Sequence, residues 1–220
     1  MTLMSRELND PRTRLFPITV RQYHRMMDQG IIEEGEPYEL LNGMIVRKDR
    51  SAQGEDPMTV GHEHIYPVSA LDELNARLRR LGCYMRIQQP ISLPPLSEPE
   101  PDGAIARGSK EDYADRLPTW DDLLCVIEVA DASLARDRVS KLEMYARGGI
   151  ERYFIVNLRD RVVECYTEPV RRKGRYAPPL ILSIRQRVTF PTAAGKGVTM
   201  AVRELFPPVL PSRGGRNGHK

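Results

Sequence analysis

The sequence has few cysteines, few aromatic residues and no long apolar run. Its three cysteines, Cys83, Cys125 and Cys165, are widely separated, and this odd number and spacing argue against a disulfide framework and a zinc site. We expect buried thiols in a reducing compartment. No apolar stretch approaches the roughly 20 residues that cross a bilayer, and the polar start does not resemble a secretory signal. These absences predict a cytoplasmic protein without a membrane partner.

The charge balance also lacks a strong excess of either sign. Lysine and arginine number 33 and aspartate and glutamate 30, which gives a net charge of +3. A surface that binds nucleic acid would therefore have to be a local one. The hydrophobic content of 40% and the charged content of 29% are ordinary for a globular protein.

The length of 220 residues is enough for one compact domain with tails. Prolines are numerous, and they gather in loops and towards the end of the chain. We expect a flexible arm over residues 1–17, one domain over residues 18–206 and a disordered tail over residues 207–220.

Two local signals stand out in the first fifty residues. Thr19 can cap a helix that runs to Asp28 and stops at Gly30. Asn42-Gly43 between two apolar runs predicts a hairpin, because both turn residues must accept a positive φ. Glu39 lies in the first strand of this hairpin, where it is either an edge-strand charge facing solvent or a functional acid.

The remaining chain alternates between helical and strand patterns. Residues 49–61 read as a mobile loop, and a helix over 62–81 should become regular near Tyr66, because Pro67 fits only a first turn. A second helix over 134–147 has an apolar stripe of Ala135, Val139, Leu142 and Ala146. The predicted strands cover residues 83–93, 102–106, 123–129, 153–156, 162–166, 180–184 and 187–190, followed by a short terminal element over 202–206.

Two carboxylates lie at the ends of apolar strands, where neither packing nor solvation requires them. Asp102 begins one short strand, and Glu128 lies near the end of the continuous apolar run from Leu123, a pattern typical of a strand buried on both faces. Partly desolvated carboxylates on neighbouring strands repel unless a cation lies between them. The pattern therefore predicts a divalent metal held by oxygen ligands, with Lys141 close by.

The segments Pro101-Asp102 and Val126-Ile127-Glu128-Val129 look like the PD-(D/E)XK nuclease pattern. Further matching segments are Tyr38-Glu39-Leu40-Leu41-Asn42-Gly43, His64 ahead of a helix, Lys141-Leu142-Glu143-Met144-Tyr145, and residues 149–156. In this order, they resemble the Uma-two family of restriction-endonuclease-like proteins within that superfamily, from about Thr19 to Glu168. The superfamily lysine would stand at Ala130, so the resemblance assigns its role to Lys141.

The resemblance implies an α/β fold of the restriction-endonuclease type, with a mixed central sheet flanked by helices and an extra β-hairpin. It implies a cytoplasmic endonuclease that hydrolyses DNA with Mg²⁺ or Mn²⁺ and that could act as a homodimer. The implied metal ligands are Asp102, Glu128 and the carbonyl of Val129. Lys141 would act on the attacking water or the phosphate, Glu39 as an auxiliary acid, and His64 as a substrate contact.

Other interpretations remain open at this point. Lys141 could simply pair with Asp137 along its helix, four residues apart. The displaced lysine and the small net charge also fit a decayed nuclease scaffold that binds nucleic acid or acts as a regulator. A metal-dependent phosphoesterase for small substrates is a third possibility.

Overall fold

The computed structural model of the protein describes residues 15–33, 35–47 and 62–208. The predicted arm, the predicted loop over residues 49–61 and the predicted tail lie mostly or wholly outside these residues. No helix in the described ranges is long and apolar enough to span a membrane.

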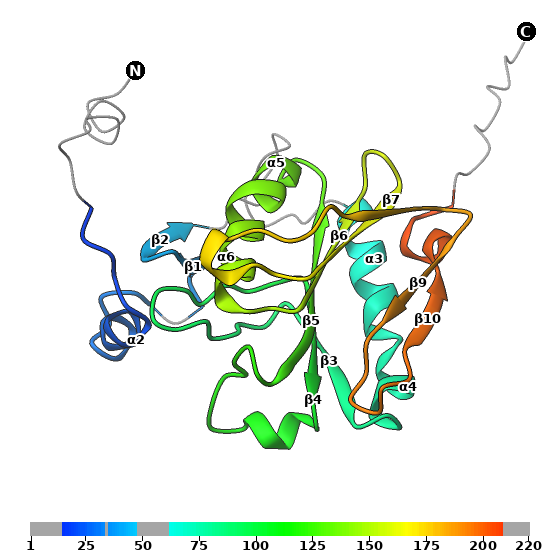
Figure 1. Ribbon diagram of the computed structural model, residues 1–220. Coiled ribbons are helices and arrows are strands. Elements are labelled where there is room, and N and C mark those ends of the chain that lie inside the picture. Colours follow the sequence, from blue (N-terminus) through cyan, green and yellow to red (C-terminus); the bar gives the residue numbers. More distant parts are fainter. Residues whose placement is uncertain (1–14, 34, 48–61, 209–220) are drawn as a thin grey trace, which may run out of the picture.

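A mixed six-stranded sheet forms the centre of the molecule (Figure 1), as the resemblance implied. Its strand order is β3-β4-β5-β6-β7-β8. The pair β5–β6 is parallel, and the other neighbouring pairs are antiparallel. The strands are β3 (Cys83–Ile87), β4 (Gly103–Arg107), β5 (Leu123–Ala130), β6 (Arg152–Asn157), β7 (Val162–Thr167) and β8 (Leu180–Ser183).

Strand β5 is buried along its whole length, which confirms the interpretation of its continuous apolar run. Successive side chains of a strand point to opposite faces. Cys125, Ile127 and Val129 therefore enter one core cluster, whereas Val126 and Ala130 enter the cluster on the other face.

Helices cover the two faces of this sheet. On the first face, α3 (His62–Asp72) and α4 (Asn75–Arg79) contribute Leu71 and Leu78 to the core. On the second face, one continuous helical segment packs Met144 and Tyr145 against the sheet. It consists of α5 (Leu134–Arg136), the π-helical turn η2 (Asp137–Lys141) and α6 (Leu142–Gly148). In Figure 1, α6 and α3 lie on either side of β5.

The N-terminal elements form a small unit beside the sheet. Helix α2 (Val20–Asp28) begins at Thr19 with a complete capping box, as the sequence predicted. Strands β1 (Tyr38–Leu41) and β2 (Met44–Arg47) form the hairpin expected from Asn42-Gly43. Tyr23, Ile32 and Leu40 make a separate core cluster for this unit.

The C-terminal part adds a second hairpin that the sequence prediction found only in part. Strand β9 (Arg187–Phe190) pairs with β10 (Val198–Ala201), which was not predicted, and both pack into the first-face core through residues such as Phe190 and Val198. The remaining elements are short 3-10 turns: η1 (Lys110–Tyr113), η3 (Arg171–Lys173) and η4 (Val202–Leu205).

Two predicted helices differ from the structure. The helix over 62–81 is divided into α3 and α4, and Pro67 lies inside α3 rather than near its start. In the second helix, Val139 is 65% exposed and Ala135 is also exposed, so the predicted stripe is wrong there. The stripe assumed a constant α-helical period, whereas the π-helical turn shifts the helix face between Asp137 and Lys141.

Candidate active site at the end of strands β4 and β5

Glu128 is a buried acid within the central strand β5. It lies between Val126 and Ala130 on β5, so the alternation of the strand turns its side chain to the face covered by α6. The carboxylate is only 3% exposed. Its Oε1 accepts hydrogen bonds from Lys141 Nζ and Tyr145 Oη, each at 2.7 Å.

Asp102 lies beside Glu128 because of the pairing of the two strands. Gly103 pairs with Ile127 across β4 and β5, and continuing this antiparallel register by one residue places Asp102 opposite Glu128. The backbone N–H of Val129 donates to Asp102 Oδ2 at 2.8 Å. The structure therefore brings together the two acids that the sequence placed on neighbouring strands.

Lys141 reaches this pair from the helical segment. It is the last residue of the π-helical turn, and its buried ammonium meets Glu128. The described part of the chain contains no ion pair within 4.0 Å between Lys141 and Asp137, so the intrahelical pair considered above is not formed. Because the π-helical turn directs Lys141 inward, its ammonium lies within hydrogen-bond distance of the buried glutamate.

Glu39 also enters the site, from the separate hairpin. It is 2% exposed, which excludes the solvent-facing alternative. Its Oε1 accepts the backbone N–H of Glu100 at 2.8 Å, two residues before Asp102. Its charge contributes to the raised pKa of both Lys141 and Glu128.

His64 lies at the rim of the site, near the start of α3. Its Nε2 is 2.9 Å from Asp102 Oδ1, and its side chain is 24% exposed. Gln88 Nε2 lies 3.4 Å from the same oxygen. Both side chains help to hold the carboxylate of Asp102 in place.

The pKa values of Glu128 and Asp102 are shifted in opposite directions. Burial, reinforced by the charges of Asp137, Asp102 and Glu39, raises the pKa of Glu128 to about 8 despite Lys141. Burial acts in the same direction on Asp102, but the contact and charge of His64, the charge of Lys141 and the Val129 N–H outweigh it and lower its pKa.

Lys141 stays charged under these conditions. Burial alone would lower its pKa, but the charges of Glu128, Glu39 and Asp137, with the hydrogen bond to Glu128, raise it above the usual value. A raised pKa keeps the ammonium protonated near neutral pH, so Lys141 acts on its neighbours through its positive charge.

Two of the acids described above are of the kind that can hold a hard divalent cation. Magnesium is commonly held by one or two carboxylates together with waters and substrate phosphates, and Asp102 and Glu128 offer two carboxylates side by side. Within residues 15–33, 35–47 and 62–208, no group of three or more His, Cys, Asp or Glu side chains could hold a metal ion. Two carboxylates are what such a magnesium site needs from the protein, while Lys141 supplies the positive charge next to Glu128 in this structure.

Two residues of the site were not recognised as functional from the sequence. Tyr145 follows Lys141 by four residues on the same helix face, and this spacing is the signal that could have found it. Asp137 is 1% exposed, and its Oδ1 has no hydrogen-bond partner in the part of the chain that the structure describes. No sequence signal marks the π-helical turn that buries it.

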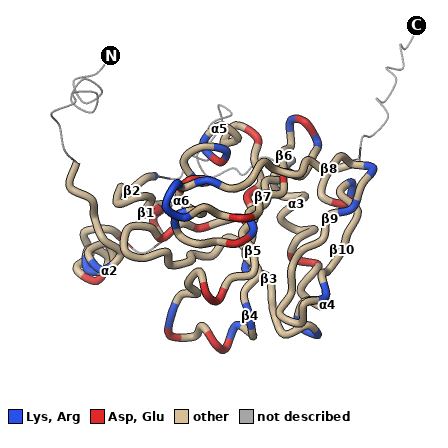
Figure 2. The backbone as a smooth tube through the Cα atoms, viewed as in Figure 1, with Lys and Arg blue, Asp and Glu red and all other residues tan. Residues whose placement is uncertain are grey.

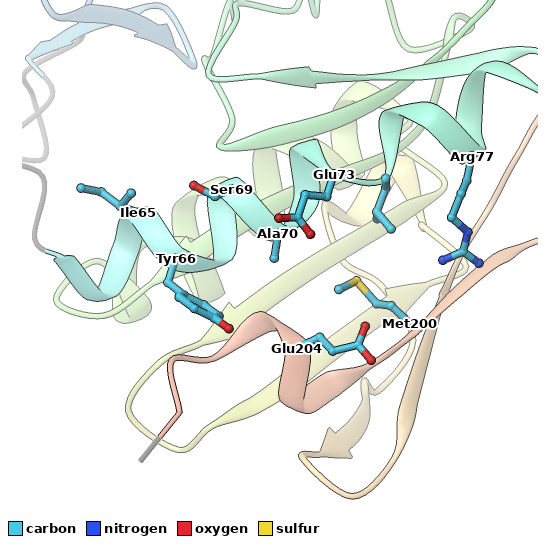
Figure 3. A pocket seen from close by; sticks show the side chains of 9 residues that line it. Ile65, Tyr66, Ser69, Ala70, Glu73, Arg77, Met200 and Glu204 are labelled. Carbon is cyan, nitrogen blue, oxygen red and sulfur yellow. The ribbon is translucent and has the colours of Figure 1, made fainter. Parts of the chain in front are cut away.

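A cavity of about 640 Å³ lies elsewhere on the molecule, between α3 and the β10–η4 segment. Figure 3 shows Tyr66, Glu73 and Glu204 around this space. Neither Asp102, Glu128 nor Glu39 lines it.

This chain resembles known proteins in its fold and in its sequence. The crystal structure of a putative nuclease belonging to DUF820 from Anabaena variabilis is similar to this chain, with a TM-score of 0.63 and 16% sequence identity, over 86% of this chain and 98% of that one. At this identity the likeness shows a shared fold. No curated protein matches the sequence. The model of the Uma2 family, described as "Putative restriction endonuclease", matches residues 20–203, and the chain therefore belongs to this family.

Proposed function

We propose that this protein is a metal-dependent endonuclease that hydrolyses phosphodiester bonds in DNA. The observation that carries the proposal is that Asp102, which directly precedes β4, lies where the β4–β5 register reaches Glu128, with the Lys141 ammonium 2.7 Å from Glu128. Family membership points to a nuclease-like function, and the metal and the DNA substrate are our inference from the residues.

In this proposal Asp102, Glu128 and the carbonyl of Val129 hold Mg²⁺ or Mn²⁺. When bound, the cation activates a water molecule and offsets charge on the phosphoryl group. Hydrolysis adds the oxygen of water to phosphorus and breaks one P–O ester bond. The residues of the chain must therefore orient the acids and stabilise the negative charge that develops on the phosphoryl oxygens.

Each remaining side chain has a defined part in this scheme. His64 holds Asp102 through its Nε2, and in this scheme it also contacts the substrate phosphate. Tyr145 holds Glu128. Lys141 provides positive charge for the phosphoryl oxygens, and Glu39 acts as the auxiliary acid that keeps the ammonium charged.

The distribution of charged residues is relevant to whether the substrate is a nucleic acid. Figure 2 shows acidic and basic residues interspersed along the described part of the chain. In the turn η3, Arg171, Arg172 and Lys173 follow one another beside α6, and Arg171 lies over the Trp120 ring at 4.6 Å. This local basic surface suits a phosphate backbone.

Cleavage of supercoiled plasmid and of single-stranded DNA with Mg²⁺, Mn²⁺ or chelator tests the proposal. We expect cutting that requires metal, disappears in Asp102→Asn and persists in Asp121→Asn, a matched change at an exposed acid. Cutting that survives in Asp102→Asn would refute the assigned site.

The alternative is a decayed nuclease that binds nucleic acid or acts as a regulator, and one observation favours it. The ammonium of Lys141 lies beside Glu128 and can balance the charge of this carboxylate. A decayed site could therefore keep its buried acid without binding a metal. This alternative predicts no cutting and no measurable Mn²⁺ binding by calorimetry. A phosphoesterase for small substrates would instead hydrolyse a simple phosphodiester with little dependence of KM on salt.

A further inference from the structure

Asp137 is a buried acid that the proposed function does not use. Its Oδ2 accepts a 2.6 Å hydrogen bond from Ser133, but Oδ1 is buried without a partner in the described residues. A buried carboxylate oxygen without a partner is unfavourable. Burial raises the pKa of Asp137, and the charge of Lys141 is the largest influence that opposes this rise.

The π-helical turn places Asp137 and Lys141 together. Its first and last residues, Asp137 and Lys141, are buried, whereas the three residues between them are exposed. Such turns are uncommon and often occur at functional sites. The turn therefore directs one acid and one ammonium into the same interior region behind the strand ends.

Lys141 is incompletely satisfied in its present position. An ammonium group has three N–H donors, and in the described structure Nζ has one hydrogen-bond partner, Glu128 Oε1. That oxygen also accepts the hydroxyl of Tyr145. A cation that joined Asp102 and Glu128 would meet the positive charge of Lys141 at this point, and the two charges would repel.

We propose that Asp137 is a second partner for the Lys141 ammonium, to which Lys141 turns when a divalent cation binds Asp102 and Glu128. The flexible four-carbon stem of lysine permits such a change without movement of the helix backbone. The move would satisfy Asp137 Oδ1 and leave Glu128 with Tyr145 and the cation. Asp137 is thus a positioning residue that acts through Lys141, and this inference rests on the proposed metal site.

Binding of Mn²⁺, followed by electron paramagnetic resonance of the free ion, tests the inference without an activity assay. Asp137→Asn keeps the size of the side chain and a polar contact for Ser133 but removes the charge. We expect Mn²⁺ affinity to fall about tenfold or more, within the usual range of coupling between sites. The melting temperature without metal should not fall, because the lost charge is itself destabilising. Asp137→Glu should recover part of the affinity, and Asp160→Asn, at an exposed acid, should bind like the parent.

A double-mutant cycle with Lys141→Met separates the possible roles. If Asp137 acts through Lys141, Asp137→Asn should have no further effect on Mn²⁺ affinity once Lys141 is replaced. Lys141→Gln serves the same purpose if the methionine variant does not fold. An equal loss of affinity with and without Lys141 would mean that Asp137 acts on the cation directly and would overturn the inference.

The outcomes also distinguish this inference from the proposed function. Parent protein that binds Mn²⁺, and loses it in Asp102→Asn, supports the metal site. If Asp137→Asn then binds Mn²⁺ like the parent, the second-partner role is wrong although the metal site stands. Parent protein that binds no Mn²⁺ would overturn the metal site, and the inference with it.

Discussion

Replacing Tyr145 by phenylalanine tests whether Glu128 is held as the structure describes. The hydroxyl of Tyr145 donates to Glu128 Oε1 at 2.7 Å, and both side chains are buried. The ring itself remains, so the substitution opens no large cavity. Tyr153→Phe is a matched control, because this equally buried tyrosine donates to the backbone carbonyl of Asp137 at 3.2 Å, a neutral acceptor.

The magnitude depends on the charge of the acceptor. A hydrogen bond to a charged group contributes about 1.5–3 kcal/mol and one between neutral groups about 0.5–1.5 kcal/mol. With the pKa of Glu128 near 8, the folded protein holds a proton on this group at pH 6 and largely loses it at pH 9. Tyr145→Phe should therefore cost about 0.5–1.5 kcal/mol at pH 6 and about 1.5–3 kcal/mol at pH 9, whereas the cost of Tyr153→Phe should not change with pH.

The sign of the background pH dependence follows from the same group. The pKa of Glu128 is raised from its usual 4.5, so between pH 4.5 and 8 the folded state binds more protons than the unfolded state. The contribution of Glu128 to stability therefore falls as pH rises through this window. Tyr145→Phe removes a donor that favours the charged form of Glu128 and so raises the pKa of Glu128 further. The fall in stability should therefore continue to a higher pH in this variant.

Urea denaturation at pH 6 and pH 9 measures these free energies of unfolding. A cost for Tyr145→Phe that is the same at both pH values would refute the assigned charge of Glu128. A cost at pH 9 no larger than that of Tyr153→Phe would refute the hydrogen bond itself.

Three further changes test the fold and the site. Gly43→Ala should lower the melting temperature by several degrees in a thermal scan, because Gly43 has φ +80° and a Cβ there would lie 2.5 Å from the Cβ of Pro17; an unchanged midpoint would contradict the hairpin turn. Leu71→Ala should cost about 2–5 kcal/mol in urea denaturation, because this fully buried side chain joins α3 to the sheet; a cost below about 1 kcal/mol would mean that α3 is not packed there. Mn²⁺ affinity in calorimetry should rise with pH up to about 8, because the cation competes with the proton on Glu128; an affinity that is flat from pH 6 to 8 would argue against Glu128 as a ligand.

The sequence predicted those features that depend on local chemistry. The capping residue Thr19, the Asn42-Gly43 turn and the apolar run of β5 each contain their own signal, and each is confirmed. The placement of Asp102 beside Glu128 followed from adjacent strands. The first three depend on patterns shorter than ten residues, whereas the approach of the two acids required two strands to be predicted as neighbours.

Features that depend on tertiary packing were not predictable in this way. The stripe through Val139 assumed an unbroken α-helix, but burial of Asp137 and Lys141 requires the π-helical turn. Strand β10 was missed because its partner β9 and the first-face core, not its own short sequence, stabilise it. The role of Tyr145 depends on which strand residue faces it, and a single helix pattern does not show that.

The hairpin that contributes Glu39 has a consequence for how the site holds together. It belongs to a two-stranded sheet with an apolar cluster of its own, and it is joined to the chain preceding β4 by backbone hydrogen bonds at Leu40 and Gly43 and to the second-face core by Leu41. Small units of this kind open more often than the centre of a large sheet. Amide hydrogens of β1 should therefore exchange with solvent faster than those of β5, and each opening would withdraw one acid from Lys141 while Asp102 and Glu128 stay in register. Such exchange would divide the site between the central sheet, which sets the positions of Asp102 and Glu128, and a hairpin that opens separately.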